Sequence, residues 1–355
     1  MKINIKSIVV MNKPFSFILG IMLSFTALAD SVQVLDPNVS FQAVHRIGQH
    51  IVASGTNGGI YQSTDNGEHW SKVTGPENSV GLQFRDIQLL SNGSLIVMSA
   101  GEGDSSRIYR TDDGKNWQLQ IAGTRATTFY DCMHFVNEQQ GWLYGDSDEE
   151  GLFILGTVDG GRHWKRQKLA LEAQAGEGGF ASSGTCLNKG RDNNIYIGTG
   201  NALTPRVLIK NSLNGQKSEQ ISWQSLDTPF LGGEAAGVFS VQQTEQWLYI
   251  FGGSLKDQQS PAKAQRYNLE KKQWSVLPEV PLKGAVYGSD VIIEDNKTKV
   301  LIANPQGVSL WQEGAKSWTM LSKNNIWSLA CDDSLGCIGA GKDGIVESFT
   351  FYSDR

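Results

Sequence analysis

One short pattern recurs three times in the first half of the chain, and its spacing constrains the fold more than any other feature. The stretches STDNGEHW, RTDDGKNW and TVDGGRHW begin at Ser63, Arg110 and Thr157, each 47 residues after the one before. A fixed period of this length is typical of a repeat architecture, in which every copy is one small structural unit. Because a catalytic constellation does not need three evenly spaced copies, we interpret the pattern as structural.

Each copy is predicted to build the tight turn between two strands. The aspartate carboxylate can accept backbone N–H groups of the turn, the glycine can adopt a positive φ, and the tryptophan can bury its ring at the start of the next strand. A metal site is the alternative, but the three copies share only one carboxylate position, so no metal is expected. The predicted turn residues are Asp65, Gly67, Trp70, Asp112, Gly114, Trp117, Asp159, Gly161 and Trp164.

Short β-rich runs fill each unit. In the second unit FRDIQLL, SLIVMSA, RIYRT and NWQLQI are separated by turn residues, and no helical pattern lies between them. Four strands in a period of about 45 residues favour a propeller over a sandwich or barrel. Residues 30–355 hold about seven such units, so we predict an all-β, seven-bladed β-propeller in a single domain.

The last unit supplies only three strands, IWSLACD, GCIGAG and IVESFTFY. The fourth is predicted to be SVQVLD, which begins at Ser31 near the other end of the sequence. Pairing of this N-terminal strand with the last unit would close the ring and hide two sheet edges.

Residues 1–29 have the pattern of a bacterial signal peptide. Lys2, Lys6 and Lys13 precede or open an apolar stretch, and Ala27-Leu28-Ala29 is a small-x-small cleavage site. A membrane anchor is the alternative, although the apolar run is short for a span of about 20 residues. We therefore expect an exported protein, periplasmic or secreted, that is not inserted in a membrane after cleavage.

The net charge and the cysteines give expectations about the partner and about disulfide bonds. The net charge of −5 argues against nucleic acid as a partner. Cys331 and Cys337 flank DDSLG, which is typical of a hairpin turn, so they are predicted to form a disulfide, with two buried thiols as the alternative. Cys132 and Cys186 occupy matching positions of neighbouring units. A bridge would need Cα atoms within about 7 Å, which is closer than neighbouring blades usually approach at that distance from the axis. We therefore expect these two cysteines to be unpaired, buried side chains.

The repeated turns resemble the Asp-box, also called the bacterial neuraminidase repeat, of sialidases and other propellers. Longer stretches, among them FRDIQLL, SRIYRTDDGKNWQLQ, TFYDCMHF, FASSGTCL and GEAAGVFSV, resemble the family of the photosystem II stability/assembly factor, in its bacterial, non-photosynthetic branch. The resemblance implies a seven-bladed, exported propeller without a bound cofactor that acts as an assembly or interaction platform.

In a propeller, the innermost strand of each blade lines the axial channel, and binding usually occurs at one mouth of it. Aligning the inner strands places Arg85, Tyr130 and Trp327 at one level and Asp86 with Asp131 at the next; a slip of one residue reverses the side that each faces. The loops GEGGFASSG and GSLKDQQSPAKAQ are expected to form a variable rim. The predicted binding residues are Arg85, Asp86, Tyr130, Asp131, Thr185, Tyr287, Asp290 and Trp327.

Asp86 and Asp131 could form a carboxylate pair for acid–base chemistry. The interpretation that we favour is that they bond the backbone of the neighbouring blade and hold the ring together.

The function predicted from these features is that of a monomeric, non-enzymatic scaffold that binds a protein or peptide. No Gly-rich dinucleotide fingerprint is present and the five histidines lack ligand spacing, so no cofactor is expected. The alternative is a glycan-active hydrolase of sialidase type. It would need three arginines, for which Arg46, Arg125 and Arg206 are the candidates, to converge beside a tyrosine and a glutamate.

Overall fold

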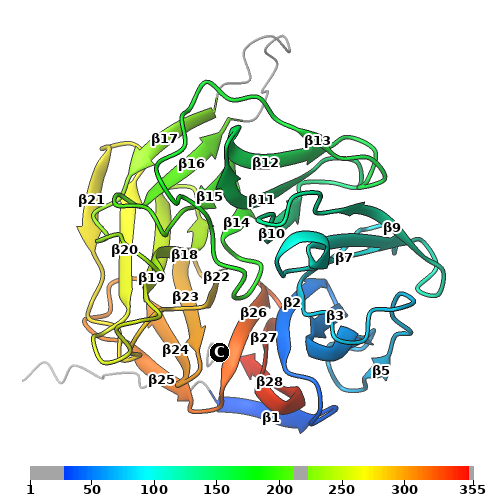
Figure 1. Cartoon of the computed structure of the whole chain (residues 1–355). Coiled ribbons are helices and arrows are strands. Elements are labelled where there is room, and N and C mark those ends of the chain that lie inside the picture. Colours follow the sequence, from blue (N-terminus) through cyan, green and yellow to red (C-terminus); the bar gives the residue numbers. More distant parts are fainter. Residues whose placement is uncertain (1–27, 212–222, 352–355) are drawn as a thin grey trace, which may run out of the picture.

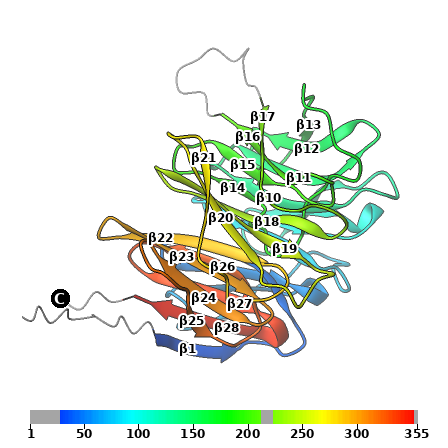
Figure 2. The same ribbon diagram turned by 90° about the vertical axis from the view of Figure 1, so that its left-hand side faces the viewer.

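Seven antiparallel four-stranded sheets form a closed ring in the computed structural model, which describes residues 28–211 and 223–351 (Figure 1). The predicted seven-bladed propeller is confirmed. Successive strands of a blade run outward from the axis, and Figure 2 shows the same ring turned by 90°. Among the described residues, no helix has the length and apolar character needed to cross a bilayer.

The strands follow one another blade by blade, and short 3₁₀ turns occur in three loops of the part of the chain that the structure describes. Blades 1 to 3 comprise β2 (Phe41–Ile47), β3 (His50–Gly55), β4 (Ile60–Ser63), β5 (Ser71–Lys72); β6 (Phe84–Leu89), β7 (Leu95–Ser99), β8 (Arg107–Thr111), β9 (Trp117–Ala122); β10 (Tyr130–Phe135), β11 (Gly141–Asp148), β12 (Gly151–Thr157) and β13 (Lys165–Arg166). Blades 4 and 5 comprise β14 (Leu187–Lys189), β15 (Ile195–Gly198), β16 (Arg206–Lys210), β17 (Trp223–Asp227); β18 (Ala236–Gln243), β19 (Trp247–Ser254), β20 (Lys263–Asn268) and β21 (Gln273–Val276). Blades 6 and 7 comprise β22 (Gly288–Glu294), β23 (Lys297–Asn304), β24 (Gly307–Gln312), β25 (Thr319–Ser322); β26 (Ile326–Asp332), β27 (Gly336–Gly341), β28 (Ile345–Thr350) and β1 (Leu28–Val34). The 3₁₀ turns are η1 (Thr56–Gly58), η2 (Gly103–Ser105) and η4 (Lys342–Gly344).

The N-terminal strand closes the ring as predicted. β1 pairs antiparallel with β28, with Val32 opposite Glu347 and Val34 opposite Ile345. This pairing makes β1 the outer strand of blade 7. Of the predicted signal peptide, only Leu28 and Ala29 lie in β1, and residues 1–27 are outside the described part of the chain.

The hydrophobic core lies between neighbouring blades. Strand β7 is buried along its whole length, whereas β9 at the outside of the same blade is half-exposed. Both faces of β7 are covered by neighbouring blades, and this explains why its sequence, LIVMS, is a nearly continuous apolar run. Ile96 of blade 2 and Leu143 of blade 3 belong to one such inter-blade cluster.

The outer hairpin turns of blades 1 and 3 share one geometry. In blade 1, Asp65 Oδ1 accepts the backbone N–H of His69 at 2.9 Å. The indole N–H of Trp70 donates to the carbonyl of Gly67 at 3.1 Å, and Gly67 has a φ of 88°. Blade 3 repeats these contacts with the corresponding residues, including Asp159. The turn is thus closed by its own aspartate and tryptophan.

The turn of blade 2 is one residue shorter, and the predicted aspartate there is wrong. Asp113, not Asp112, accepts the backbone N–H groups of Lys115 at 2.9 Å and Asn116 at 2.7 Å. The prediction placed the aspartate five residues before the tryptophan, as in blades 1 and 3, and so chose Asp112. In blade 2 the segment between the aspartate and Trp117 is one residue shorter, so the equivalent residue is Asp113.

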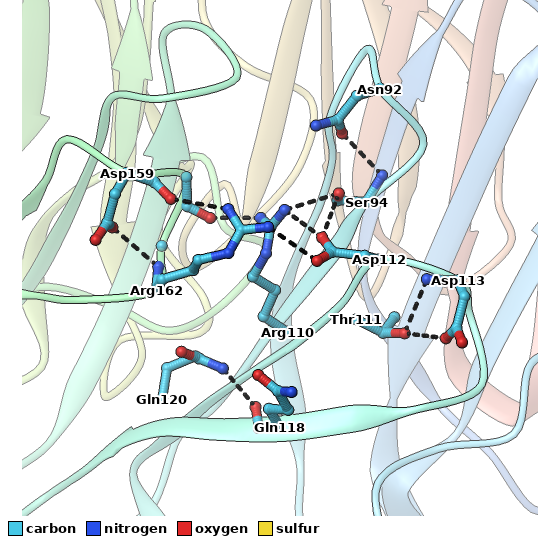
Figure 3. A network of polar contacts seen from close by, with 12 residues as sticks. Asn92, Ser94, Arg110, Thr111, Asp112, Asp113, Gln118, Gln120, Asp159 and Arg162 are labelled. Carbon is cyan, nitrogen blue, oxygen red and sulfur yellow. Dashed lines mark hydrogen bonds and ion pairs between the residues drawn. The ribbon is translucent and has the colours of Figure 1, made fainter.

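Asp112 instead joins the hairpins of blades 2 and 3 (Figure 3). Its carboxylate accepts hydrogen bonds from Ser94 Oγ at 2.8 Å and from Arg162 Nη2 at 2.9 Å, and it also binds Arg110. The buried Arg110 guanidinium donates further to the carbonyl of Gly160 in the next blade. These groups fasten two neighbouring blades at the outer, lower edge of the ring.

Two disulfides are present. Cys331 and Cys337 are bonded across β26 and β27, with Cα atoms 4.0 Å apart. Cys132 and Cys186 are also bonded, with Cα atoms 6.0 Å apart, so the expectation of unpaired side chains is wrong. Both are fully buried at the inner edges of blades 3 and 4, where adjacent strands converge toward the axis closely enough for a bridge.

Candidate functional site

Five of the seven inner strands carry a β-bulge close to their first residue, and each bulge adds one residue to that strand. A bulge changes the direction of a side chain relative to the regular pleat. All five extra side chains line a single cavity of about 460 Å³ at one end of the channel, which we name the upper pocket. These five residues are Gln42, Arg85, Asp131, Phe239 and Trp327.

Aromatic rings form one wall of the upper pocket. Phe180 stacks on Phe239 with ring centroids 3.6 Å apart and an interplanar angle of 2°. Tyr287 lies parallel to Phe239 at 6.3 Å, and Trp327 meets Tyr287 edge-on at the same distance.

Phe180 reaches this wall on the insertion between β13 and β14, which extends into the centre of the ring (Figure 1). Ser183 Oγ donates to the carbonyl of Tyr287 at 2.8 Å, and Ser328 Oγ donates to the carbonyl of Ser183 at 3.1 Å. A Cβ on Gly184, whose φ is 79°, would lie 2.9 Å from Asp86. The segment predicted to be a variable rim therefore crosses the channel and forms the floor of the upper pocket.

Two carboxyl groups from neighbouring strands lie on the opposite side of the upper pocket. Asp131, on β10, is 1% exposed and accepts the backbone N–H of Gly179 at 2.9 Å; Asp146 is on β11. Burial raises the pKa of Asp146 to about 6. Burial, and then the neighbouring charge of Asp146, raise the pKa of Asp131 well above its ordinary value, although Arg85 opposes this.

Arg85 supplies the positive charge of the upper pocket. Its Nε and Nη2 atoms donate to Gln83 Oε1, and Nη1 donates to the carbonyl of Ala181 at 2.9 Å. Burial lowers the pKa of Arg85, while Tyr287 and Asp131 act in the opposite direction. The guanidinium is thus fixed between the inserted segment and its own blade.

Asp86, Thr185 and Asp290 line a narrower cavity of about 180 Å³ below the inserted segment. Asp86 Oδ2 accepts the backbone N–H of Met133 in the next blade at 2.7 Å, and Asp290 Oδ2 accepts that of Cys331 at 2.7 Å. Burial raises the pKa of both carboxyl groups to about 7. These contacts agree with the favoured interpretation for Asp86, which is a bond that holds the ring together.

The alternative of a carboxylate pair between Asp86 and Asp131 is wrong, because the two residues line different cavities. Asp131 is the bulge residue of its strand, whereas Asp86 follows the bulge. Tyr130 was aligned with Arg85 by the same one-residue error. It is 1% exposed in the core between blades 2 and 3 and lines neither cavity, so its prediction as a binding residue is also wrong.

Sequence reasoning missed Gln42, Asp146, Phe180 and Phe239. A signal for Phe239 was present, since it precedes Ser240 as Arg85 precedes Asp86. Gln42, Asp146 and Phe180 come from loops or from irregular positions of strands, and the alternation of residues along a strand does not locate such positions.

At the opposite end of the channel, which we name the lower mouth, polar residues line a cavity of about 370 Å³. Arg191 of blade 4 forms an ion pair with Asp333 of blade 7 at 2.9 Å. His45 and His134 are partly buried nearby, with ring centroids 6.4 Å apart, and desolvation lowers their pKa values to about 4 and about 3.

The three arginines nominated for a sialidase-type site do not converge. Arg46 donates to the carbonyls of its own turn and of blade 7, and Arg125 binds the partly buried Asp148 and the exposed Glu150. Arg206 is paired with Glu177 at 2.7 Å. Among the described residues that line the upper pocket, Arg85 is the one arginine.

The fold and pocket place the chain among seven-bladed propellers with a ligand-sized cavity at one mouth. A Kelch motif matches residues 248–281, in blade 5. YCF48, a photosystem II assembly factor, has a similar fold in a solved complex, YCF48 bound to D1 peptide, with a TM-score of 0.62, 13% identity, and coverage of 94% of this chain and 99% of that one.

Two further solved structures show the same likeness. YCF48 from Cyanidioschyzon merolae has a TM-score of 0.61 and 12% identity, covering 92% of this chain and 98% of that one. A chain of the mitotic checkpoint complex has a TM-score of 0.58 and 12% identity, covering 99% of this chain and 100% of that one. At these identities the likeness establishes the shared fold alone. No curated protein sequence matches the chain significantly.

Proposed function

We propose that this protein is an exported, non-enzymatic scaffold that binds a segment of a protein or peptide partner in the upper pocket. The observation that carries the proposal is the convergence of five bulge side chains on one cavity with an aromatic wall. Mostly apolar cavities of about 300–1,000 Å³ with a few polar groups are typical ligand sites. The solved complex of YCF48 with a D1 peptide supports a peptide as the kind of ligand.

The cellular setting in this proposal rests on the sequence. The pattern of residues 1–29 supports export to the periplasm or beyond, in a bacterium, and monomeric action is the simplest form for a ring that closes on itself. The resemblance to the assembly-factor family supports a role as a platform.

Selection from a random peptide library on the immobilised full-length mature protein tests the proposal. Enriched peptides would be labelled and titrated by fluorescence anisotropy. Trp327→Ala and Tyr287→Ala are expected to weaken binding about tenfold or more, because buried aromatic contacts dominate such interfaces. Lys189→Ala and Arg191→Ala, at the lower mouth, are matched controls and should leave the affinity unchanged. Peptides that bind all four variants equally, or no enrichment at all, would overturn the proposal.

A further inference from the structure

We infer that the upper pocket selects a segment that presents a positively charged side chain, lysine or arginine, to Asp131 and Asp146. This inference rests on the proposed function and names the chemistry of its ligand.

The segment that covers the channel passes over the two carboxylates with its backbone. Gly178 and Gly179 pass directly over them: a Cβ on Gly178 would lie 1.8 Å from Asp146 Oδ1, and one on Gly179 would lie 2.9 Å from Asp131. With glycine at both positions, the backbone can pass this close, because neither position has a side chain that would clash with the acids. The inserted segment also donates the backbone N–H of Gly179 to the Asp131 carboxylate.

No described lysine or arginine lies within 4.0 Å of either carboxylate to form an ion pair. Other inward-facing acids of this region are paired. Glu177, whose side chain is fully buried, binds Arg206 at 2.7 Å, and Asp148 binds Arg166 at 2.8 Å. Buried acids without a counter-ion are costly to ionise, and a cationic ligand removes that cost.

The remainder of the pocket suits such a side chain. The aromatic residues that line the pocket, among them Phe180, Tyr287 and Trp327, can cover its alkyl stem, and aromatic rings attract a cation. Arg85 contributes one positive charge against two acids, so the pocket is negative when both are ionised, and its guanidinium is already held by Gln83 and Ala181. An acidic segment would meet the carboxylates with like charge.

Peptides selected at pH 7.5 on the full-length mature protein provide the test. The best binder would be compared with analogues in which its basic residue is replaced by norleucine or acetyl-lysine. Enrichment of lysine or arginine and about tenfold weaker binding of the analogues are expected. Asp131→Asn/Asp146→Asn should remove the preference, and Asp146→Asn alone should reduce it. Asp148→Asn, beside the pocket but outside it, should keep the preference.

Affinity for the basic peptide should also rise between pH 5 and pH 7.5, as Asp146 with its pKa of about 6 loses its proton. The norleucine analogue should show no such rise. The other groups that face the pair are Arg85, Tyr144 and Tyr287, and burial raises the tyrosine pKa values, so none of them changes charge in this range. Glu177 remains bound to Arg206.

The possible failures are distinguishable. Selected peptides without basic residues, or analogues that bind as well as the basic peptide, would overturn the inference while binding still depends on Trp327. If the Trp327→Ala variant bound the selected peptides as tightly as the wild-type protein does, the proposed function itself would be overturned.

Discussion

The two ends of the channel are made from the same inner strands, but they differ in whether their charged side chains have a partner. At the lower end, Arg191 is paired with Asp333, and the hairpin aspartates accept N–H groups of their own turns. At the upper end, bulges turn Asp131 toward a cavity where it has no counter-ion. Ion pairs and turn contacts thus satisfy the charged groups at the lower end, whereas a buried carboxyl group at the upper end lacks a counter-ion, which is costly when it is ionised.

The largest expected effect comes from the disulfide beneath the upper pocket. Cys132→Ala/Cys186→Ala opens a loop with a sequence separation of 54, and the chain-entropy relation gives a loss of about 4 kcal/mol. The matched control is Cys331→Ala/Cys337→Ala, with a separation of 6, for which about 2 kcal/mol is expected. Chemical unfolding in urea measures both. Equal losses would show that the bridge between blades 3 and 4 has no special role in holding the inserted segment.

A pH-dependent effect is expected inside the ring. Burial raises the folded-state pKa of Asp86 to about 7, so the folded protein binds its proton more tightly than the unfolded chain, and this stabilisation declines as the pH rises from about 4 to about 7. Asp86→Ser should therefore be less destabilising at pH 8 than at pH 4.5, by roughly 3 kcal/mol. Ser328 follows its bulge as Asp86 does and accepts the N–H of Val44, so serine suits the position.

Urea unfolding of both proteins at the two pH values measures this difference. His45 and His134 have lowered pKa values and act with the opposite sign, but they are common to both proteins. A penalty that is constant with pH would show that Asp86 titrates normally in the fold.

At the lower end, Asp159→Ala should cost about 1–2 kcal/mol, because the backbone N–H groups of Arg162 and His163 lose their acceptor. Glu68→Ala, in the matching turn of blade 1, should change stability by less than about 0.5 kcal/mol. Thermal unfolding measures both variants. If the two substitutions had the same effect, the aspartate would not be the fastener of the turn.

The fold was predictable because its signals are local and repeated: a 47-residue period, four short strands per unit, and an N-terminal strand without a partner. The site was predicted only in part. Arg85, Asp131, Tyr287 and Trp327 were named correctly as lining residues, but Tyr130 was not, because a bulge shifts the register by one residue and no sequence pattern marks it.

Two other differences have physical reasons of the same kind. The deletion in the blade 2 turn moved the capping role from Asp112 to Asp113. The insertion that brings Phe180 to the pocket is rich in glycine, which is typical of an exposed loop, and only its contacts with three blades show that it is buried.

The smallest expected effect is at the ion pair of the lower mouth. Arg191→Ala removes a partly exposed contact with Asp333 and should cost less than about 1 kcal/mol, since exposed pairs are screened by water and salt. Thermal unfolding at low and high salt measures this cost, and the difference from wild type should shrink as salt is added. A loss as large as that for the buried disulfide would mean that the lower mouth is held by this one contact. Such a loss would contradict the expectation that several contacts hold the lower end, since the Asp333 carboxylate also accepts the N–H of Ile293 and should keep its strand in place without Arg191.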